Sequence, residues 1–306
     1  MSGRRGVLEE SMKNRARSLV RIGFLMLFLA LLIPGTAQAK KTAKKKTDSY
    51  VIKINKLQNT VTVYKKRKAI KAFPCSTGRI TPTGTFRIQQ RMRWHVLKGP
   101  CYGQYCSRIY KGILFHSVWY HKQNSGTLSN SSYNRLGTTA SHGCVRLTVK
   151  DAKWIYDHCR LGTKVVIGEG RTLKKPTRPK VRVSTKKRAG WDPTDPDSRN
   201  PYRPKLTLKK KATKTIVYGS TFNIKNMVNV SSSYASSDAL LKSMKVKGKV
   251  NTKKAGTYKV QCTITDPYTA VSVTKTFTFK VGKKPKQTRT EKKAPTELTT
   301  EEKTAE

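Results

Sequence analysis

The chain has 306 residues, of which 65 are Lys or Arg and 16 are Asp or Glu, so its formal net charge is +49 at pH 7. This length exceeds one ordinary small domain and indicates two domains with flexible ends. Six scattered cysteines in so long a chain exclude a small disulfide-stabilised scaffold and a zinc-finger module. The positive excess favours a polyanionic partner, which is nucleic acid, anionic lipid or an anionic cell wall.

The N-terminal segment indicates which of these polyanions the chain meets. Basic residues precede an apolar run from Ile22 to Ile33, and Ala37-Gln38-Ala39 fits a signal-peptidase site. We expect residues 1–39 to be a signal peptide. The run is shorter than the roughly 20 residues of a membrane span, although an uncleaved membrane anchor remains the alternative. Export argues against nucleic acid and favours anionic cell-wall polymers, with a membrane as partner only if the segment stays uncleaved.

Strand signals follow a basic linker at residues 40–48. The stretch "YVIKINKLQNTVTVYKKRKAIKAFPCSTG" predicts a hairpin and a third strand, and "TPTGTFRIQQRM" and "GILFHSVWY" predict two more. Residues 121–141 are polar and predict a long functional loop. The stretch "TVKDAKWIYDHCR" is the one convincing amphipathic helix, and "TKVVIG" predicts a closing strand.

The second half of the chain has a different composition. Residues 169–204 are rich in Pro and Lys and predict an extended linker. Residues 205–282 alternate apolar and polar residues in short runs, as in a small β-sandwich, and residues 283–306 predict a disordered tail. The expected fold class is therefore mainly β: a β-rich domain at 49–168 with one main helix after a Cys motif, then a β-sandwich.

The stretch "SHGCVRL" at residues 141–147 concentrates reactive groups. Cys144 has four interpretations: zinc ligand, half of a disulfide, inert buried residue or nucleophile. Gly143 leaves room for a substrate to approach the backbone. A thiol between a polar loop and a helix start would have amides for an oxyanion and a helix dipole that lowers its pKa, and Arg146 adds positive charge. These neighbours favour the nucleophile.

A thiol nucleophile needs a base to take its proton. The candidates are His116, His121 and His142, with His95 and His158 less favoured. His116 lies in the apolar strand "ILFHSVWY", where a polar ring requires a partner or a function. A histidine on a rigid strand together with a separate cysteine suggests a Cys–His pair.

These residues resemble a known family. "FHS", then "SHGCVRL" and "DA…W…GT.V.I", and upstream "STG…TPTGTF", look like the catalytic domain of the L,D-transpeptidases, the cysteine enzymes that cross-link bacterial cell walls. The resemblance covers roughly residues 49–168. It implies that Cys144 is the nucleophile and His116 the proton donor and acceptor. The gap between that His and the motif is longer than usual in the family, so His121 is the alternative base. We prefer His116, because it lies on the strand whose flanking residues match and a strand is a more rigid platform than a loop.

The remaining motif residues receive supporting roles in this resemblance. Gly143 and the Cys144 amide are the expected oxyanion donors, and His142 is expected to orient the loop. Arg146 would pin the motif or meet a substrate carboxylate, and Ser141 could do either. We expect no metal and no cofactor.

The implied reaction joins the third residues of two peptidoglycan stem peptides through a Cys thioester, outside the cell. A carboxypeptidase, another cysteine wall hydrolase and a non-catalytic wall-binding protein are the alternatives. The stretch "GKVNTKKAGTYKVQCTITD" resembles bacterial immunoglobulin-like (Ig-like) domains of surface proteins. Cys101 and Cys106 are the one near pair of cysteines that could form a disulfide.

Overall fold

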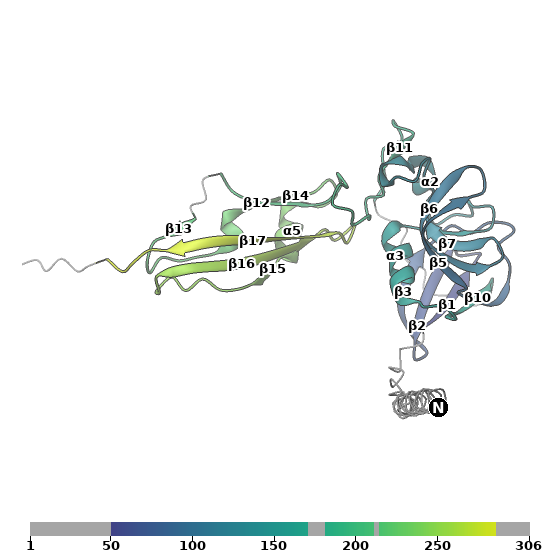
Figure 1. Cartoon of the computed structure of the whole chain (residues 1–306), viewed down its shortest axis with the longest axis horizontal. Coiled ribbons are helices and arrows are strands. Elements are labelled where there is room, and N and C mark those ends of the chain that lie inside the picture. Colours follow the sequence, from purple (N-terminus) through teal and green to yellow (C-terminus); the bar gives the residue numbers. More distant parts are fainter. Residues whose placement is uncertain (1–49, 171–180, 211–213, 286–306) are drawn as a thin grey trace, which may run out of the picture. The chain divides into compact units, whose positions relative to one another are not determined.

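The structure is a computed structural model that describes residues 50–170, 181–210 and 214–285 (Figure 1). The expected signal peptide, the basic linker and the end of the tail lie outside these residues. No helix among the described residues has the length and apolar character needed to span a membrane.

Two sheets and one main helix form the domain that begins at Tyr50. The first sheet has the order β3-β2-β1-β10-β4 and the second β5-β6-β7-β9. The strands of the first sheet are β1 (Tyr50–Asn55), β2 (Thr60–Lys65), β3 (Lys68–Pro74), β4 (Gly84–Arg87) and β10 (Lys164–Gly168). The strands of the second sheet are β5 (Gln90–Leu97), β6 (Cys101–Tyr110), β7 (Ile113–Ser117) and β9 (Val145–Leu147).

The first sheet follows the alternation of its sequence. In the hairpin of β1 and β2, Ile52 lies opposite Val63 and Ile54 opposite Val61, and all four side chains are buried. The closing strand β10 pairs in parallel with β1 and places Val165 beside Ile52. Both sheets and the main helix share one apolar core, which confirms the predicted β-rich domain.

The main helix is α3 (Val149–His158). Its buried positions Ala152 and Ile155, followed by Cys159 just beyond its end, recur at helical spacing and contribute to the shared core. The helix packs against β6 and β7, so it supports from behind the strand that carries His116.

The expected long loop contains short elements instead of being irregular throughout. They are a 3₁₀ turn η1 (Ser125–Thr127), β8 (Leu128–Ser129) and α2 (Asn130–Asn134). Leu128, Tyr133 and Leu136 are buried, so three spaced apolar side chains anchor a stretch whose overall composition is polar.

Part of the expected linker packs on this domain, which corrects the prediction of an extended segment over 169–204. Val181 and Val183 are buried, and β11 (Ala189–Gly190) pairs with β8. The Asp192 carboxylate accepts a hydrogen bond of 2.8 Å from the Val149 amide at the start of α3. Mainly hydrogen bonds attach this segment to the domain. Because such contacts leave no apolar periodicity in the sequence, the composition alone suggested a linker.

The C-terminal part has its own core, separate from the first. A four-stranded sheet has the order β13-β17-β16-β15, and β12 pairs with β14. The strands are β12 (Lys205–Leu208), β13 (Thr215–Ile216), β14 (Val228–Ser231), β15 (Lys245–Lys247), β16 (Gly256–Thr265) and β17 (Ser272–Val281), and the helices are α4 (Ile224–Met227) and α5 (Ser237–Ser243). These strands confirm the mainly β prediction.

Candidate active site

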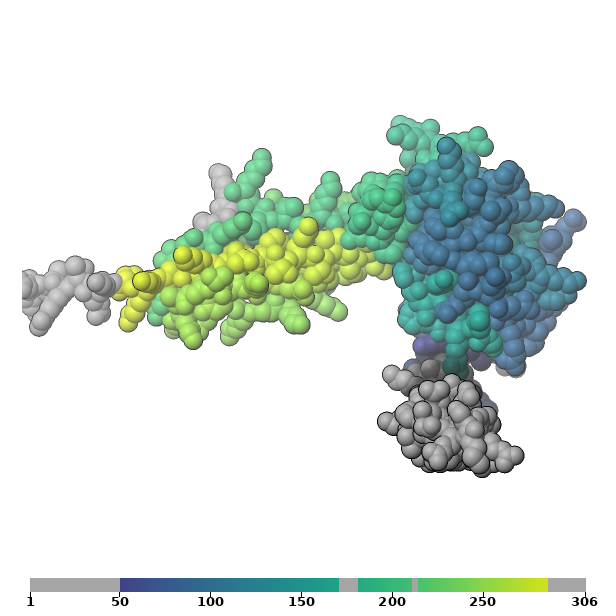
Figure 2. Space-filling view, viewed as in Figure 1, coloured from purple at the N-terminus to yellow at the C-terminus, as the bar shows by residue number. Residues whose placement is uncertain are grey.

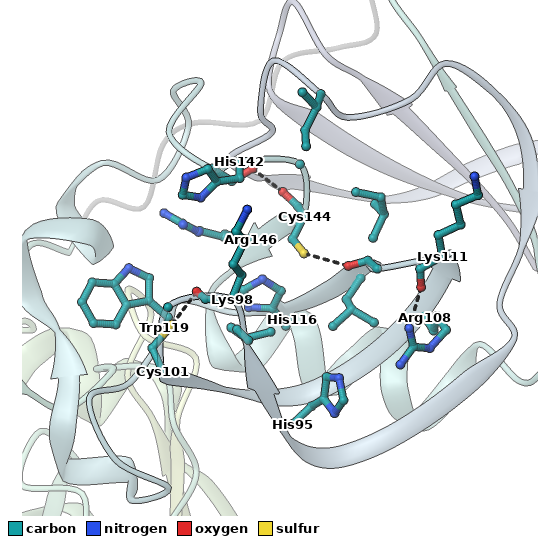
Figure 3. A pocket seen from close by; sticks show the side chains of 18 of the residues that line it. His95, Lys98, Cys101, Arg108, Lys111, His116, Trp119, His142, Cys144 and Arg146 are labelled. Atoms are coloured by element: carbon teal, nitrogen blue, oxygen red, sulfur yellow. Dashed lines mark hydrogen bonds between the residues drawn. The ribbon is translucent and has the colours of Figure 1, made fainter.

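The motif cysteine lies at the entrance to the second sheet. Cys144 directly precedes β9, which pairs in parallel with β7 so that Arg146 lies opposite His116. Because side chains alternate along a strand, Cys144 and Arg146 point to the same side. Figure 3 shows Cys144, Arg146 and His116 around one cavity. The parallel pairing of two short strands thus brings together residues 28 positions apart in the sequence.

A cavity of about 810 Å³ opens over these three residues. Its walls combine apolar and basic side chains, and within the part of the chain that the structure describes no Asp or Glu lines it. The apolar lining includes Ile80, Val96, Leu97, Tyr110, Ile113 and Trp119, and the basic lining Lys98, Arg108, Lys111 and Arg146. Such a lining suits a ligand that carries carboxylates.

Three hydrogen bonds hold the turn that carries the thiol. Ser141 Oγ donates to the Cys144 carbonyl at 2.6 Å, and Arg146 Nη1 donates to the Ala140 carbonyl at 2.7 Å. Thr81 Oγ1, from the "TPTG" stretch, donates to the Gly143 carbonyl at 2.8 Å. The turn is therefore fixed from both sides. Arg146 and Ser141 were expected either to hold the motif in place or to contact a substrate carboxylate. In the structure both hold the motif in place.

Two glycines permit the close approach of the "STG" stretch and the motif. A Cβ on Gly78 would lie 2.2 Å from the His142 carbonyl oxygen, far inside contact distance. A Cβ on Gly143 would lie 2.9 Å from Ile80 Cγ1 and 2.8 Å from Ile113 Cδ1. The space beside Gly143, expected to receive substrate, is therefore filled by these two isoleucines.

The expected helix dipole at the thiol is absent, which is a second correction. The strand β9 separates Cys144 from α3, which begins five residues later at Val149. The Cys144 thiol donates to the Gly112 carbonyl at 3.5 Å. Burial raises the pKa of this thiol, and a hydrogen bond with the Leu114 backbone and the nearby Arg146 oppose this shift without cancelling it. The resting thiol is therefore protonated at neutral pH.

His116 is 2% exposed, and one of its two ring nitrogens is hydrogen-bonded to the main chain. Its Nδ1 lies within hydrogen-bond distance of the Ser117 carbonyl, which can only accept, so Nδ1 carries the proton and Nε2 has a free lone pair. Burial, helped by Arg146, lowers the pKa of the ring to about 3. His116 is thus a neutral imidazole with Nε2 available as a base.

The other histidines lie differently. His121 packs edge-on against Trp119 and is not among the residues that line the cavity, whereas His95 lines it. The His142 ring is exposed and forms no hydrogen bond with the described residues. Its backbone carbonyl accepts from the Ile80 amide at 3.3 Å instead, so the loop is ordered by main chain and not by the expected ring.

Backbone amides near the thiol are unused. Neither the Gly143 nor the Cys144 amide donates a hydrogen bond to any described residue. Both are thus free to donate to an oxyanion on a bound substrate.

Cys101 and Cys106 are free thiols, and Cys101 lines the cavity. Sequence reasoning missed the turn at Lys111 and Gly112, whose position over the thiol depends on the β6–β7 hairpin.

Comparison with known proteins agrees with this geometry. Residues 49–167 match the L,D-transpeptidase catalytic domain family (YkuD), and residues 206–281 match the Ig-like domain family of bacterial surface proteins. YciB of Bacillus subtilis (strain 168), whose name assigns it provisionally to the L,D-transpeptidases, is 41% identical over 91 residues. That alignment covers 28% of this chain and 46% of YciB, so the chain spans about half of this curated relative.

Solved structures of L,D-transpeptidases are among those that the chain resembles. One from Mycobacterium smegmatis is 21% identical, with a TM-score of 0.34, and the match covers 40% of this chain and 59% of that one. Another, from Mycobacterium tuberculosis H37Rv, is 24% identical, with a TM-score of 0.33 and coverage of 40% and 58%. The chain therefore contains an L,D-transpeptidase catalytic domain at residues 49–167, followed by a bacterial surface Ig-like domain at residues 206–281.

Proposed function

We propose that this chain is an exported L,D-transpeptidase that joins the third residues of two peptidoglycan stem peptides through a thioester on Cys144. The observation that carries the proposal is the pairing of a thiol and a neutral imidazole in one cavity, with Nε2 of His116 unprotonated. Two unused amides, of Gly143 and Cys144, supply oxyanion donors beside the same sulfur.

Acylation begins when the donor peptide enters the cavity. His116 Nε2 takes the thiol proton as Cys144 Sγ attacks the carbonyl carbon of the third residue. The carbonyl oxygen becomes an oxyanion that accepts from the two amides. When the tetrahedral intermediate collapses, the carbon–nitrogen bond breaks, His116 returns the proton to the amine of the departing D-alanine, and a thioester remains.

Deacylation repeats these steps with a second peptide. The side-chain amine of the acceptor's third residue attacks the thioester carbon and gives its proton to His116. The carbon–sulfur bond breaks, the sulfur regains a proton, and an amide cross-link is formed. Water in place of the amine would release a tripeptide instead, which is carboxypeptidase activity.

The basic lining of the cavity supports a stem-peptide substrate, since such peptides carry carboxylates on both sides of the bond that breaks. Lys98 and Arg146 lie on one side of the sulfur and Arg108 and Lys111 on the other (Figure 3). Attraction to anionic wall polymers follows from the net charge, which stays near +45 after removal of residues 1–39 with their six basic and two acidic residues. Both features agree with an enzyme that works in the cell wall.

The test is incubation of the purified mature chain with tetrapeptide-containing wall fragments, followed by mass spectrometry. Dimers that have lost one D-alanine, joined between third residues, are the expected products. Tripeptide monomers without dimers would reassign the chain as a carboxypeptidase. No product, together with no covalent adduct on Cys144, would favour a wall-binding protein without catalysis.

A further inference from the structure

One face of the four-stranded sheet in the Ig-like domain is left open. Along β16, Val260, Cys262 and Ile264 are buried in the domain's core, so Lys259, Gln261 and the residues in step with them point outward. The pairing register carries this outward set to β15 and β17. In Figure 2 the green to yellow atoms of β16 and β17 form continuous surface.

We call this outward set the open sheet face. Its residues are Lys245 and Lys247 on β15, Thr257, Lys259, Gln261, Thr263 and Thr265 on β16, and Ser272, Thr274, Thr276, Thr278 and Lys280 on β17. It contains four lysines, hydroxyl groups and one amide, and neither an acidic nor an aromatic side chain. None of the four lysines forms an ion pair with any residue in the described ranges 50–170, 181–210 and 214–285.

The register arranges three of these lysines in a line. Lys247 lies opposite Gln261, two residues from Lys259, and Lys259 lies opposite Thr278, two residues from Lys280. Each step is a diagonal neighbour on a sheet, about 7–8 Å apart. Lys245 adds a fourth charge at the β15 edge. Lys247, Lys259 and Lys280 therefore form a diagonal row of cations across three strands.

Hydroxyl groups run beside this row. Thr263 and Thr274 share a hydrogen bond of 2.9 Å between their Oγ1 atoms, and Thr265 and Ser272 share one of 2.8 Å. Each pair uses one proton, so the other hydroxyl of the pair can still donate outward. Lysine cations with hydroxyl donors are the groups that hold phosphate oxygens.

From this arrangement we propose that the open sheet face binds a linear phosphodiester polymer of the cell wall, laid along the Lys247–Lys259–Lys280 diagonal. The inference rests on the wall location proposed above but not on catalysis. A face with evenly spaced cations suits a chain whose charges also repeat. A neutral glycan would instead be expected to use aromatic platforms, because sugar rings stack on them, and this face has none.

The charge of the surrounding domain also favours an anionic polymer over a neutral glycan. Residues 205–282 contain fifteen lysines, no arginine and two aspartates. Of the aspartates, Asp266 is fully buried and Asp238 lies on α5, so neither belongs to the open sheet face. The open sheet face therefore meets an anionic polymer with no local repulsion.

The experiment compares two variants of the mature chain with the same change in charge. In the face variant, Lys245, Lys247, Lys259 and Lys280 become Gln. In the matched control, four equally exposed lysines outside the four-stranded sheet become Gln: Lys205, Lys209, Lys225 and Lys242. Affinity for purified poly(glycerol phosphate) is measured by calorimetry from 50 to 200 mM NaCl, and circular dichroism checks that both variants fold.

We expect the face variant to lose at least tenfold in affinity, and its slope of log affinity against log salt to fall by about three to four, roughly one per lost contact. The control should change by less than threefold. Equal losses in both variants would overturn the face in favour of diffuse attraction. Equal, salt-independent binding of walls stripped of phosphodiester polymer would overturn the ligand class. Binding needs no turnover, so an inactive catalytic domain leaves this test intact.

Discussion

Replacing Asp192 with Ala should destabilise the catalytic domain, although the residue lies beyond its expected C-terminal boundary. The Asp192 side chain is 0% exposed. It accepts from the Val149 amide at 2.8 Å, and from the Thr194 amide and hydroxyl at 2.7 and 2.6 Å. The substitution leaves two backbone amides without an acceptor in a buried place. At about 1–3 kcal/mol for each, the loss is about 2–6 kcal/mol of unfolding free energy.

The Asp192 carboxyl also gives this stability a pH dependence. Burial raises its pKa to about 7, whereas an unfolded Asp titrates near about 3.9. Between these values the folded chain holds a proton that the unfolded chain has released, so the unfolding free energy falls as pH rises from about 4 to about 7. The slope is at most about 1.4 kcal/mol per pH unit. Asp192→Ala removes this slope, so its destabilising effect should be larger at pH 5 than at pH 8.

Tryptophan fluorescence isolates the relevant domain in urea unfolding. All four tryptophans lie between Trp94 and Trp191, and the Ig-like domain contains none. The control is Asp197→Ala in the same segment, where the partner Arg199 is 72% exposed and solvent screens the ion pair, so its loss should change stability little. If both variants unfolded at the same urea concentration, the segment would be a linker and the reasoning would be wrong.

Three further outcomes test the site. Cys144→Ala should abolish cross-linking and adduct formation, whereas Cys262→Ala, in the other domain, should leave turnover unchanged; mass spectrometry of products decides. His116→Ala should lower kcat by roughly 10²–10⁴ and His121→Ala by far less, so a reversed order in steady-state kinetics would move the base to the loop. Because burial raises the pKa of Cys144 above its usual value near 9, its alkylation by iodoacetamide, followed on its own peptide, should accelerate through pH 9. A plateau below pH 7 would reveal a preformed thiolate.

The periodicity of apolar residues predicted those elements whose formation depends on neighbouring residues in the sequence. The alternation around Ile52 and Val63 predicted the first hairpin, and the spacing of Ala152 and Ile155 predicted α3. The motif around Cys144 was sufficient to nominate a nucleophile. His116 was preferred to His121 as the base because it lies on a strand, but sequence alone does not show which ring the β7–β9 pairing brings into the cavity.

The failures have a different physical origin. The segment that contains Asp192 attaches through polar groups whose partners are more than 40 residues away, and hydrogen bonds of this kind leave no periodicity. The helix dipole was assigned to Cys144 because "GCVRL" precedes α3 closely. Three residues of strand between them were not distinguishable from a loop, and they moved the thiol away from the helix terminus.

The pKa shifts of Cys144 and His116 both favour the neutral form of each group, a protonated thiol beside a neutral imidazole. With no helix terminus beside it, the Cys144 thiol has the positive charges of Arg146 and Arg108 near it, and burial outweighs their effect on its pKa. Burial also keeps His116 neutral. Both pKa shifts disfavour a thiolate–imidazolium ion pair, so in the proposed reaction the thiolate would form only as proton transfer is coupled to attack on a bound carbonyl. A protonated thiol is also a poor target for oxidants, because oxidation proceeds through the thiolate. A site that withholds its thiolate until substrate arrives would therefore protect the one sulfur on which the proposed reaction depends.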